Sequence, residues 1–271
     1  MIRAALPKPP SSRMRPFMPS LIRDITTVFS REITPEIRSP LSILFAMGQP
    51  LLFLVLFGSM LVGAGADLGA RGGDVWQWFL PGILVMMCLM GPLSAGHGML
   101  SELNGGQMER FLATPISRTS IVLGRTAKDV IILFAQATLL TAIAIPLGMN
   151  FHLLGALAAM ALLIVIATGL SAFSYVLAIA SMPSGNLFWI VTQMLIFPTT
   201  LLSGILLPVS SGPGWLSGIA AINPITYIVD AARVLFIGDF LDTSVLRGTI
   251  VAAVVAAVGL VLSTRTMKRG I

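Results

Sequence analysis

The sequence has little charge and few side chains suited to covalent or metal chemistry. Charged residues make up 10% of its 271 positions, and it contains one cysteine and two histidines. A single cysteine cannot form an intrachain disulfide. The chain has neither a His-Glu-x-x-His zinc motif nor a Gly-x-Ser-x-Gly nucleophile motif. A soluble domain of this length needs far more surface charge, so these absences argue against a soluble enzyme.

The phosphate-binding pattern Gly-x-x-x-x-Gly-Lys-Ser/Thr is also absent, because no lysine follows the glycine-rich residues 63–66. We therefore expect no catalytic residue, cofactor or metal on this chain, and any ATP must be bound by another chain. Ser94 and His97 lie one helical turn apart, a spacing that is common by chance, and we expect His97 to hydrogen-bond near the end of its helix. A membrane-embedded enzyme remains the weaker alternative.

Long apolar runs dominate the chain, of which 56% is hydrophobic. A helix needs about 20 apolar residues, at 1.5 Å each, to cross a bilayer. Six runs reach this length, and they predict an all-α protein with six transmembrane helices. The expected spans are 41–62, 78–100, 121–147, 153–180, 187–207 and 245–262. They form one membrane domain, 20–263, between a disordered basic tail, 1–19, and a short basic tail, 264–271.

Basic residues predict how the spans are oriented. Seven lie in residues 1–40, four between residues 110 and 128, and three after residue 264. With six spans, these 14 of the 17 Lys and Arg residues fall on the side of both termini. Because cytoplasmic loops of membrane proteins are enriched in Lys and Arg, both termini are expected in the cytoplasm. The same rule accounts for the net charge of +6, so no nucleic-acid partner is expected.

Two segments outside the spans are patterned. Apolar residues recur at helical spacing over residues 21–33 with charges between them, which predicts an amphipathic helix in the membrane interface. A plain leader helix is the alternative. Residues 208–240 are too apolar for a simple loop, and Asn223-Pro224 is a good helix start. They predict two short re-entrant helices, with an amphipathic surface helix as the alternative.

Three charges fall in the first turns of the 121–147 span. Arg125, Lys128 and Asp129 are costly at the bilayer centre, but near a helix end long side chains can reach the headgroups. Arg125 and Asp129 are four residues apart, so we expect them to pair. A proton relay through Asp129 is the less favoured interpretation.

The segment 101–118, SELNGGQMERFLATPISR, carries a family resemblance. Its landmarks are an acidic residue, a glycine, a Glu-Arg-hydrophobic-Leu stretch and a proline: Glu102, Gly106, Glu109, Arg110, Phe111, Leu112 and Pro115. With Arg38-Ser39-Pro40, Phe197-Pro198 and Asn223-Pro224 in order, about residues 25–262 resemble ABC-2 type permeases of the daunorubicin-resistance branch. Asn104 departs from the pattern, since relatives often carry an acidic residue there. Which carboxylate makes the main ATPase contact therefore stays open.

The resemblance implies a type V ABC exporter-like fold in the bacterial inner membrane. It implies a dimer with a second permease copy or a related permease, bound to two copies of an ABC ATPase subunit that hold ATP and magnesium. The 101–118 segment would be the helix that contacts the ATPase. The cargo would be a hydrophobic drug, antibiotic or lipid-like molecule taken from the cytoplasm or inner leaflet. A lipid-linked glycan exporter and a secondary transporter are alternatives, the last disfavoured because the expected route has no acidic residue at midplane.

The resemblance places the substrate route along the first, second and fifth spans, at the seam between permeases. Polar side chains in these apolar helices are candidates because they are costly there without a use, and aromatic or Met side chains beside them can adapt to varied ligands. Simple helix packing is the alternative for each. The candidates are Gln49, Phe53, Met86, Thr192, Gln193, Phe197 and Ser203.

Overall fold

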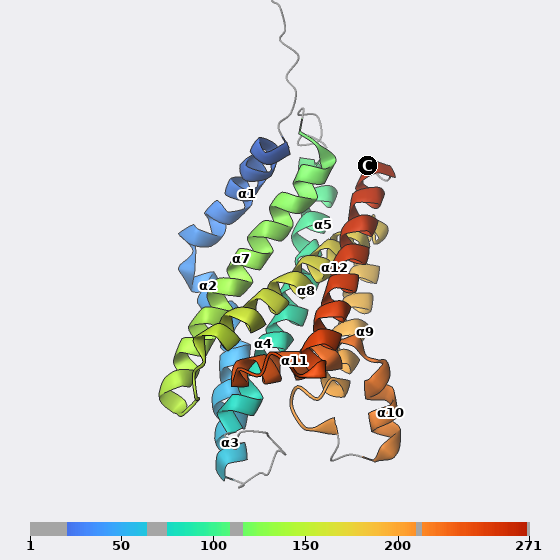
Figure 1. Cartoon of the computed structure of the whole chain (residues 1–271). Coiled ribbons are helices and arrows are strands. Elements are labelled where there is room, and N and C mark those ends of the chain that lie inside the picture. Colours follow the sequence, from blue (N-terminus) through green and yellow to red (C-terminus); the bar gives the residue numbers. More distant parts are fainter. Residues whose placement is uncertain (1–20, 64–74, 109–115, 210–212, 270–271) are drawn as a thin grey trace, which may run out of the picture.

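The structure is a computed structural model that describes residues 21–63, 75–108, 116–209 and 213–269. In this part of the chain all regular elements are helices (Figure 1). They are α1 (Leu21–Arg38), α2 (Pro40–Leu52), α3 (Gly58–Gly63), α4 (Val75–Ser94), α5 (Gly96–Asn104), α7 (Arg118–Ala144), α8 (Leu153–Ala180), α9 (Asn186–Leu202), α10 (Gly214–Ile222), α11 (Pro224–Ile237) and α12 (Thr243–Arg269). A π-helical turn, Phe53–Phe57, joins α2 to α3, and a 3₁₀ turn, Ile145–Leu147, follows α7. The all-helical prediction is confirmed.

Five continuous helices are long and apolar enough to cross a membrane. They are Leu44–Gly63, Val75–Asn104, Arg118–Leu147, Leu153–Ala180 and Thr243–Met267, and they correspond to five of the six predicted spans.

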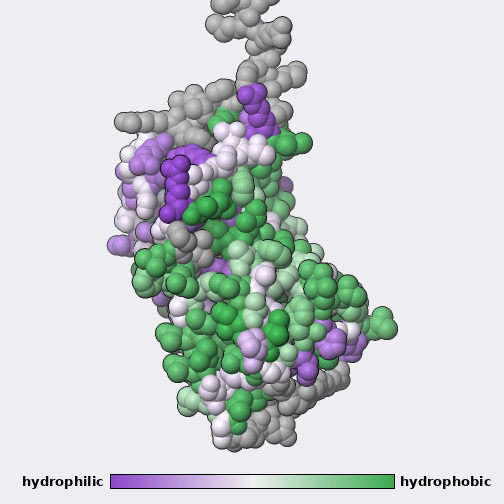
Figure 2. Space-filling view, turned by 90° about the vertical axis from the view of Figure 1, so that its left-hand side faces the viewer, coloured by the Kyte–Doolittle hydropathy of each residue, from purple (hydrophilic) through white to green (hydrophobic). Residues whose placement is uncertain are grey.

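The first residues of α1 and the last of α12 lie at the same end of the bundle (Figure 1). We call it the charged end, because hydrophilic side chains gather there on the side of α1 and α2 while the surface below is mostly hydrophobic (Figure 2).

The remaining predicted span, 187–207, corresponds to α9, an apolar helix of 17 residues. The helix ends at Leu202 rather than at Leu207, so its predicted end was wrong. Gly204 adopts a φ of +73°, a left-handed conformation that glycine tolerates and that does not continue an α-helix. At about 1.5 Å per residue, α9 is only about 25 Å long.

The expected pair of short helices is present as α10 and α11, which bend by 91° across a one-residue break. Asn223 caps α11 by accepting a hydrogen bond from the backbone N–H of Ile225 at 3.0 Å, and Pro224 fills the first helical position. Arg233 then fixes α11 to its neighbours. Its guanidinium donates to the carbonyls of Trp78 and Gly204, at 3.1 and 2.7 Å, and lies 3.7 Å from the Trp78 ring centroid. Broken helices at membrane depth need such protein contacts.

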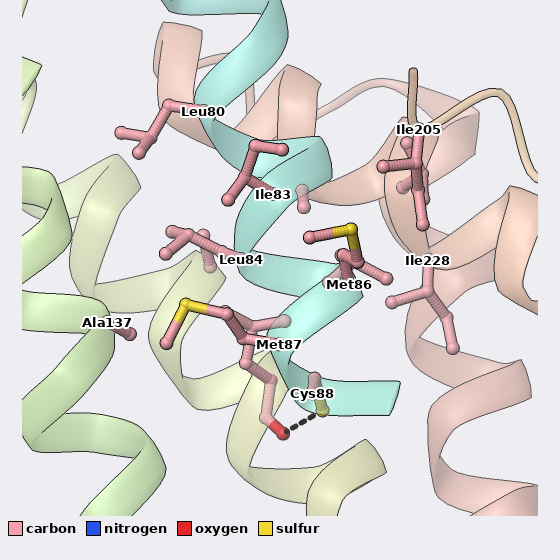
Figure 3. Packing of buried hydrophobic residues seen from close by; sticks show 14 of the residues in the cluster. Leu80, Ile83, Leu84, Met86, Met87, Cys88, Ala137, Ile205 and Ile228 are labelled. Carbon is pink, nitrogen blue, oxygen red and sulfur yellow. Dashed lines mark hydrogen bonds between the residues drawn. The ribbon is translucent and has the colours of Figure 1, made fainter. Parts of the chain in front are cut away.

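The core is built around α4, whose side chains are buried almost all the way round. In Figure 3, Met86 points toward Ile205 and Ile228, whereas Met87 points toward Ala137 of α7. Cys88 is buried beside them, and its thiol donates a hydrogen bond to the Leu163 carbonyl of α8. A helix that is apolar on every side is typical of the centre of a membrane bundle.

Candidate coupling site at the charged end

Arg125 lies at the centre of the charged end, although α7 places it among apolar residues. Its side chain is 3% exposed, and its guanidinium pairs with two carboxylates from other helices. One is Glu102 on α5, and the other is Glu32 on α1, at 3.1 Å. Arg31 on α1 lies 3.6 Å from the other oxygen of Glu102. A buried guanidinium is tolerated when it is paired in this way, so the cluster holds α1, α5 and α7 together.

The predicted pair between Arg125 and Asp129 does not form. Because Glu32 and Glu102 both reach Arg125, the Asp129 carboxylate makes other contacts. One of its oxygens lies 3.0 Å from the Lys128 ammonium, and the other accepts a hydrogen bond from the Tyr175 hydroxyl of α8. Spacing on one helix predicted the pair, but partners on neighbouring helices replaced it.

Helix α1 can reach these partners because it approaches α7 closely. A Cβ at Gly124 would lie 2.7 Å from the Val28 Cβ, which is closer than side chains tolerate. The absence of a side chain at Gly124 therefore sets the distance between the helices. The predicted amphipathic helix is confirmed over Leu21–Arg38, with Val28 buried and Ile22 exposed.

The far end of the 101–118 segment is also held by α1. Asp24 is buried, and its carboxylate accepts a hydrogen bond from the backbone N–H of Ser117 at 3.1 Å. Ser117 is the N-cap of α7, since its hydroxyl accepts from the Ser120 N–H. Arg118 next to it donates to the Met267 carbonyl of α12 at 3.1 Å. Helix α1 therefore contacts both Glu102 and Ser117, which lie near the two ends of the 101–118 segment in the sequence.

The structure describes only part of the predicted coupling set. Glu102 is directed inward to Arg125 and Arg31, and Gly106 follows α5 with a φ of +68°, a conformation suited to glycine. The other predicted residues lie outside the described part of the chain: Glu109, Arg110, Phe111, Leu112 and Pro115. Nothing in the sequence distinguishes Asp24, Arg31 and Glu32 as site residues, because charges on an amphipathic helix resemble an ordinary solvated face.

The predicted substrate-route residues do not gather at one place in a single chain. Gln193 and Phe197 are exposed on α9, whereas Thr192 is buried. Ser203 is buried and donates to the Thr200 carbonyl at 3.0 Å, a local contact that fits helix packing. Met86 is buried in the core of α4. Phe53 stacks on Phe57 with ring centroids 5.1 Å apart, and Gln49 is exposed one turn before it.

A cavity of about 400 Å³ lies between the α1–α2 junction, α4 and α7. Its polar lining mixes charged and uncharged groups, which are Glu36, Gln49, Ser94, Lys128, Asp129 and Gln136. Gln49 is thus the predicted route residue that this cavity includes. His97 lies nearby on α5, but its ring packs against the Trp189 ring, with centroids 4.9 Å apart. The cavity lies next to the charged cluster, because Lys128 and Asp129 follow Arg125 by one turn of α7.

Comparison with known proteins decides the family. The model of the ABC-2 type transporter family matches residues 23–237. The chain belongs to the ABC-2 type transporter family. Its permease relatives include a protein named as transport permease ycf38 of Cyanophora paradoxa, which is 27% identical over 79% of this chain and 74% of its own length.

Two bacterial relatives carry names that refer to drugs. The daunorubicin resistance ABC transporter permease protein DrrB1 of Streptomyces coeruleorubidus is 27% identical over 73% of this chain and 70% of its own length. The protein named as multidrug ABC transporter permease YbhR of Escherichia coli is 28% identical over 60% of this chain and 45% of its own length. The chain is therefore a multi-pass membrane protein and a permease subunit of an ABC transporter, and Glu32, Glu102 and Arg125 lie within the family-matched region.

Proposed function

We propose that this permease is the membrane subunit of an ATP-driven exporter that moves a hydrophobic drug, antibiotic or lipid-like molecule out of the cytoplasm or the inner leaflet. Two copies of a separate ATPase subunit bind ATP and magnesium, and the permease pairs with a second copy or a related permease. It resides in the bacterial inner membrane with both termini in the cytoplasm. The segment 1–19 is a basic tail, 20–263 the membrane domain and 264–271 a second basic tail.

One observation carries this proposal: α1 is attached to both ends of the 101–118 segment. A force applied to that segment by a soluble partner reaches α5 through Glu102 and α7 through Ser117. Because Arg125 also joins α5 and α7 to α1, the three helices are expected to move as one body. ATPase closure would then tilt the helix pair α4–α5 and α7 together.

The chemistry of the segment supports an ATPase contact. Glu109 and Arg110 supply charges that can form charge-assisted hydrogen bonds with a soluble subunit, and Phe111 and Leu112 supply apolar contact. Glu102 is already paired with Arg125 and Arg31 inside the permease. We therefore assign Glu109 as the main acidic contact with the ATPase and Glu102 as the residue that holds the segment in place.

The route between permeases is proposed from the exposed side chains of α2 and α9. Gln193 and Phe197 face outward on α9, and Phe45 and Gln49 do so on α2. The names of DrrB1 and YbhR support a drug as cargo. A second permease at these faces would bring the predicted polar and aromatic residues of the two chains together.

The test is purification of the tagged permease with the ATPase encoded beside it. We expect an ATPase of roughly 30 kDa to copurify, with its hydrolysis stimulated by the permease. Glu109→Ala or Arg110→Ala should uncouple ATP hydrolysis from export in proteoliposomes while assembly survives. Asp239→Asn, in the exposed residues between α11 and α12, is the control. Unchanged export in both uncoupling variants would contradict the assigned contact, and a permease without any ATPase partner would contradict the function.

A further inference from the structure

The cavity between the α1–α2 junction, α4 and α7 lies where the charged end meets the apolar bundle. Arg118–Leu147 has 30 residues, so it is about 45 Å long and exceeds the hydrocarbon core of about 30 Å. Lys128 and Asp129 follow the start of α7 by about 15 Å. With Leu147 at the far boundary of the hydrocarbon core, Asp129 is about 27 Å away from it and lies close to the near boundary between headgroups and acyl chains, the depth at which an amphiphile places its polar head.

Among the described charged groups that line the cavity, one carboxylate has no ion-pair partner. Lys128 and Asp129 pair with each other at 3.0 Å, and the Tyr175 hydroxyl also binds Asp129. Glu36, near the end of α1, is the third charged group of the lining. Among the described residues no basic group lies within ion-pair distance of the Glu36 carboxylate. Among the described lining residues, two carboxylates and one ammonium give a net negative charge.

The backbone adds a further acceptor. Pro50 lies inside α2 and has no N–H, so the carbonyl of Ala46, four residues earlier, lacks its usual helical hydrogen bond. Both residues line the cavity. The side chains of Met87, Met90 and Leu133 supply an apolar wall, and methionine adapts to ligands of different shape.

We propose that this cavity binds a monovalent organic cation with an apolar body. The cationic head lies at Glu36 and near the Ala46 carbonyl, and the body packs on Met87, Met90 and Leu133. The volume of about 400 Å³ suits a drug-sized molecule, since such sites span about 300–1,000 Å³. That this cation is cargo rests on the proposed function. The site lies among helices α1, α2, α4 and α7 of one chain, shares Gln49 with the proposed route, and does not require an ATPase.

The test compares two ions of the same shape and opposite charge. The full-length permease is reconstituted in phosphatidylcholine nanodiscs, and equilibrium binding of radiolabelled tetraphenylphosphonium and tetraphenylborate is measured. We expect saturable binding of the phosphonium and only partitioning of the borate into the bilayer. Glu36→Gln should weaken phosphonium binding about fivefold or more, the effect of one unit charge at 4 Å even at the dielectric constant of water. Glu36→Asp should retain binding.

Two further variants test whether phosphonium affinity changes with the charge of the lining in the expected direction. Asp239→Asn removes an equal charge from an exposed loop far from the cavity and should leave binding unchanged. Lys128→Gln removes the positive charge of the lining and should tighten phosphonium binding. Equal affinity for the two ions, or an unchanged dissociation constant in Glu36→Gln, would overturn the proposal.

The cation could reach the cavity as a free molecule or as a lipid with a cationic headgroup. Adding lysyl-phosphatidylglycerol to the nanodiscs distinguishes these sources. If the lipid competes with the phosphonium, the site is assigned to a cationic lipid. If it does not compete, the site is assigned to a free organic cation. Both outcomes are consistent with a cation site. Binding is measured without the ATPase, so its failure would refute this site alone. Normal binding with no ATP-driven export would instead refute the proposed function.

Discussion

Replacing Arg125 by methionine tests whether the buried charge cluster couples the helices or merely stabilises them. Arg125 is 3% exposed, while the side chains of Glu32 and Glu102 are 16% and 20% exposed. Breaking a buried ion pair by removing one partner costs about 3–5 kcal/mol, because the remaining charge is left without compensation. Since both carboxylates retain some contact with solvent, we expect Arg125→Met to destabilise the permease by about 3 kcal/mol, the lower end of that range.

The triple variant Arg125→Met, Glu32→Gln and Glu102→Gln separates stability from coupling. Replacing all members of a buried charge cluster by apolar residues of similar volume is often close to neutral in stability, and the two glutamines, at partly exposed positions, can hydrogen-bond to solvent. We therefore expect the triple variant to recover most of the lost thermal stability. Export should remain defective, because α1, α5 and α7 are no longer tied by charge.

The assays are thermal unfolding of the purified permease in detergent, followed by ATP-driven export and ATPase activity in proteoliposomes with the partner subunit. Glu109→Ala serves as the uncoupled reference. An Arg125→Met protein as stable as the parent would refute the claim that Arg125 compensates buried carboxylates. Normal export per ATP hydrolysed in the triple variant would refute the claim that the cluster couples α1, α5 and α7, even if the stability changed as expected.

Three further predictions follow from single contacts. Gly124→Val should push α1 away from α7 and lower the melting temperature, as overpacking costs about 1–3 kcal/mol; unchanged melting would contradict the close approach. Asp24→Ala should lower export by freeing the Ser117 N–H, whereas Asp24→Asn should retain it because the amide oxygen still accepts the bond; equal loss in both would point to the charge instead. Arg233→Met should loosen α11, seen as faster hydrogen exchange of its backbone, and unchanged exchange would show that Arg233 is not what holds α11.

The spans were predictable because their signal is local. Hydropathy depends on about 20 consecutive residues, and five predicted spans became long helices. The bend between α10 and α11 was predictable too, since Asn223 and Pro224 carry the cap and the first turn by themselves. The end of α9 was not, because residues 205–207 are as apolar as the helix before them. The helix ends where Gly204 adopts a left-handed conformation, and the sequence does not show which φ a glycine adopts.

The partners of the buried charges were beyond prediction for a different reason. Arg125 and Asp129 have ideal spacing on one helix, but a pair at this spacing contributes only about 0.2–0.5 kcal/mol. A buried guanidinium needs more compensation than one carboxylate on its own helix can give, and two carboxylates from α1 and α5 supply it. Identifying them requires knowing that α1 lies against α7, and that in turn depends on Gly124. A sequence read element by element does not contain this information.

The position of α1 gives the two proposals a common physical basis. Glu32 ties α1 to Arg125, and Glu36, one turn later on the same helix, lines the cavity. A movement of the 101–118 segment that shifts α1 against α7 must therefore change the distance between Glu36 and the Lys128–Asp129 pair. If the cavity holds a cation, the same movement alters how strongly the cation is held. The chain thus provides a short structural route from the proposed ATPase contact to the proposed binding site, through the amphipathic helix α1.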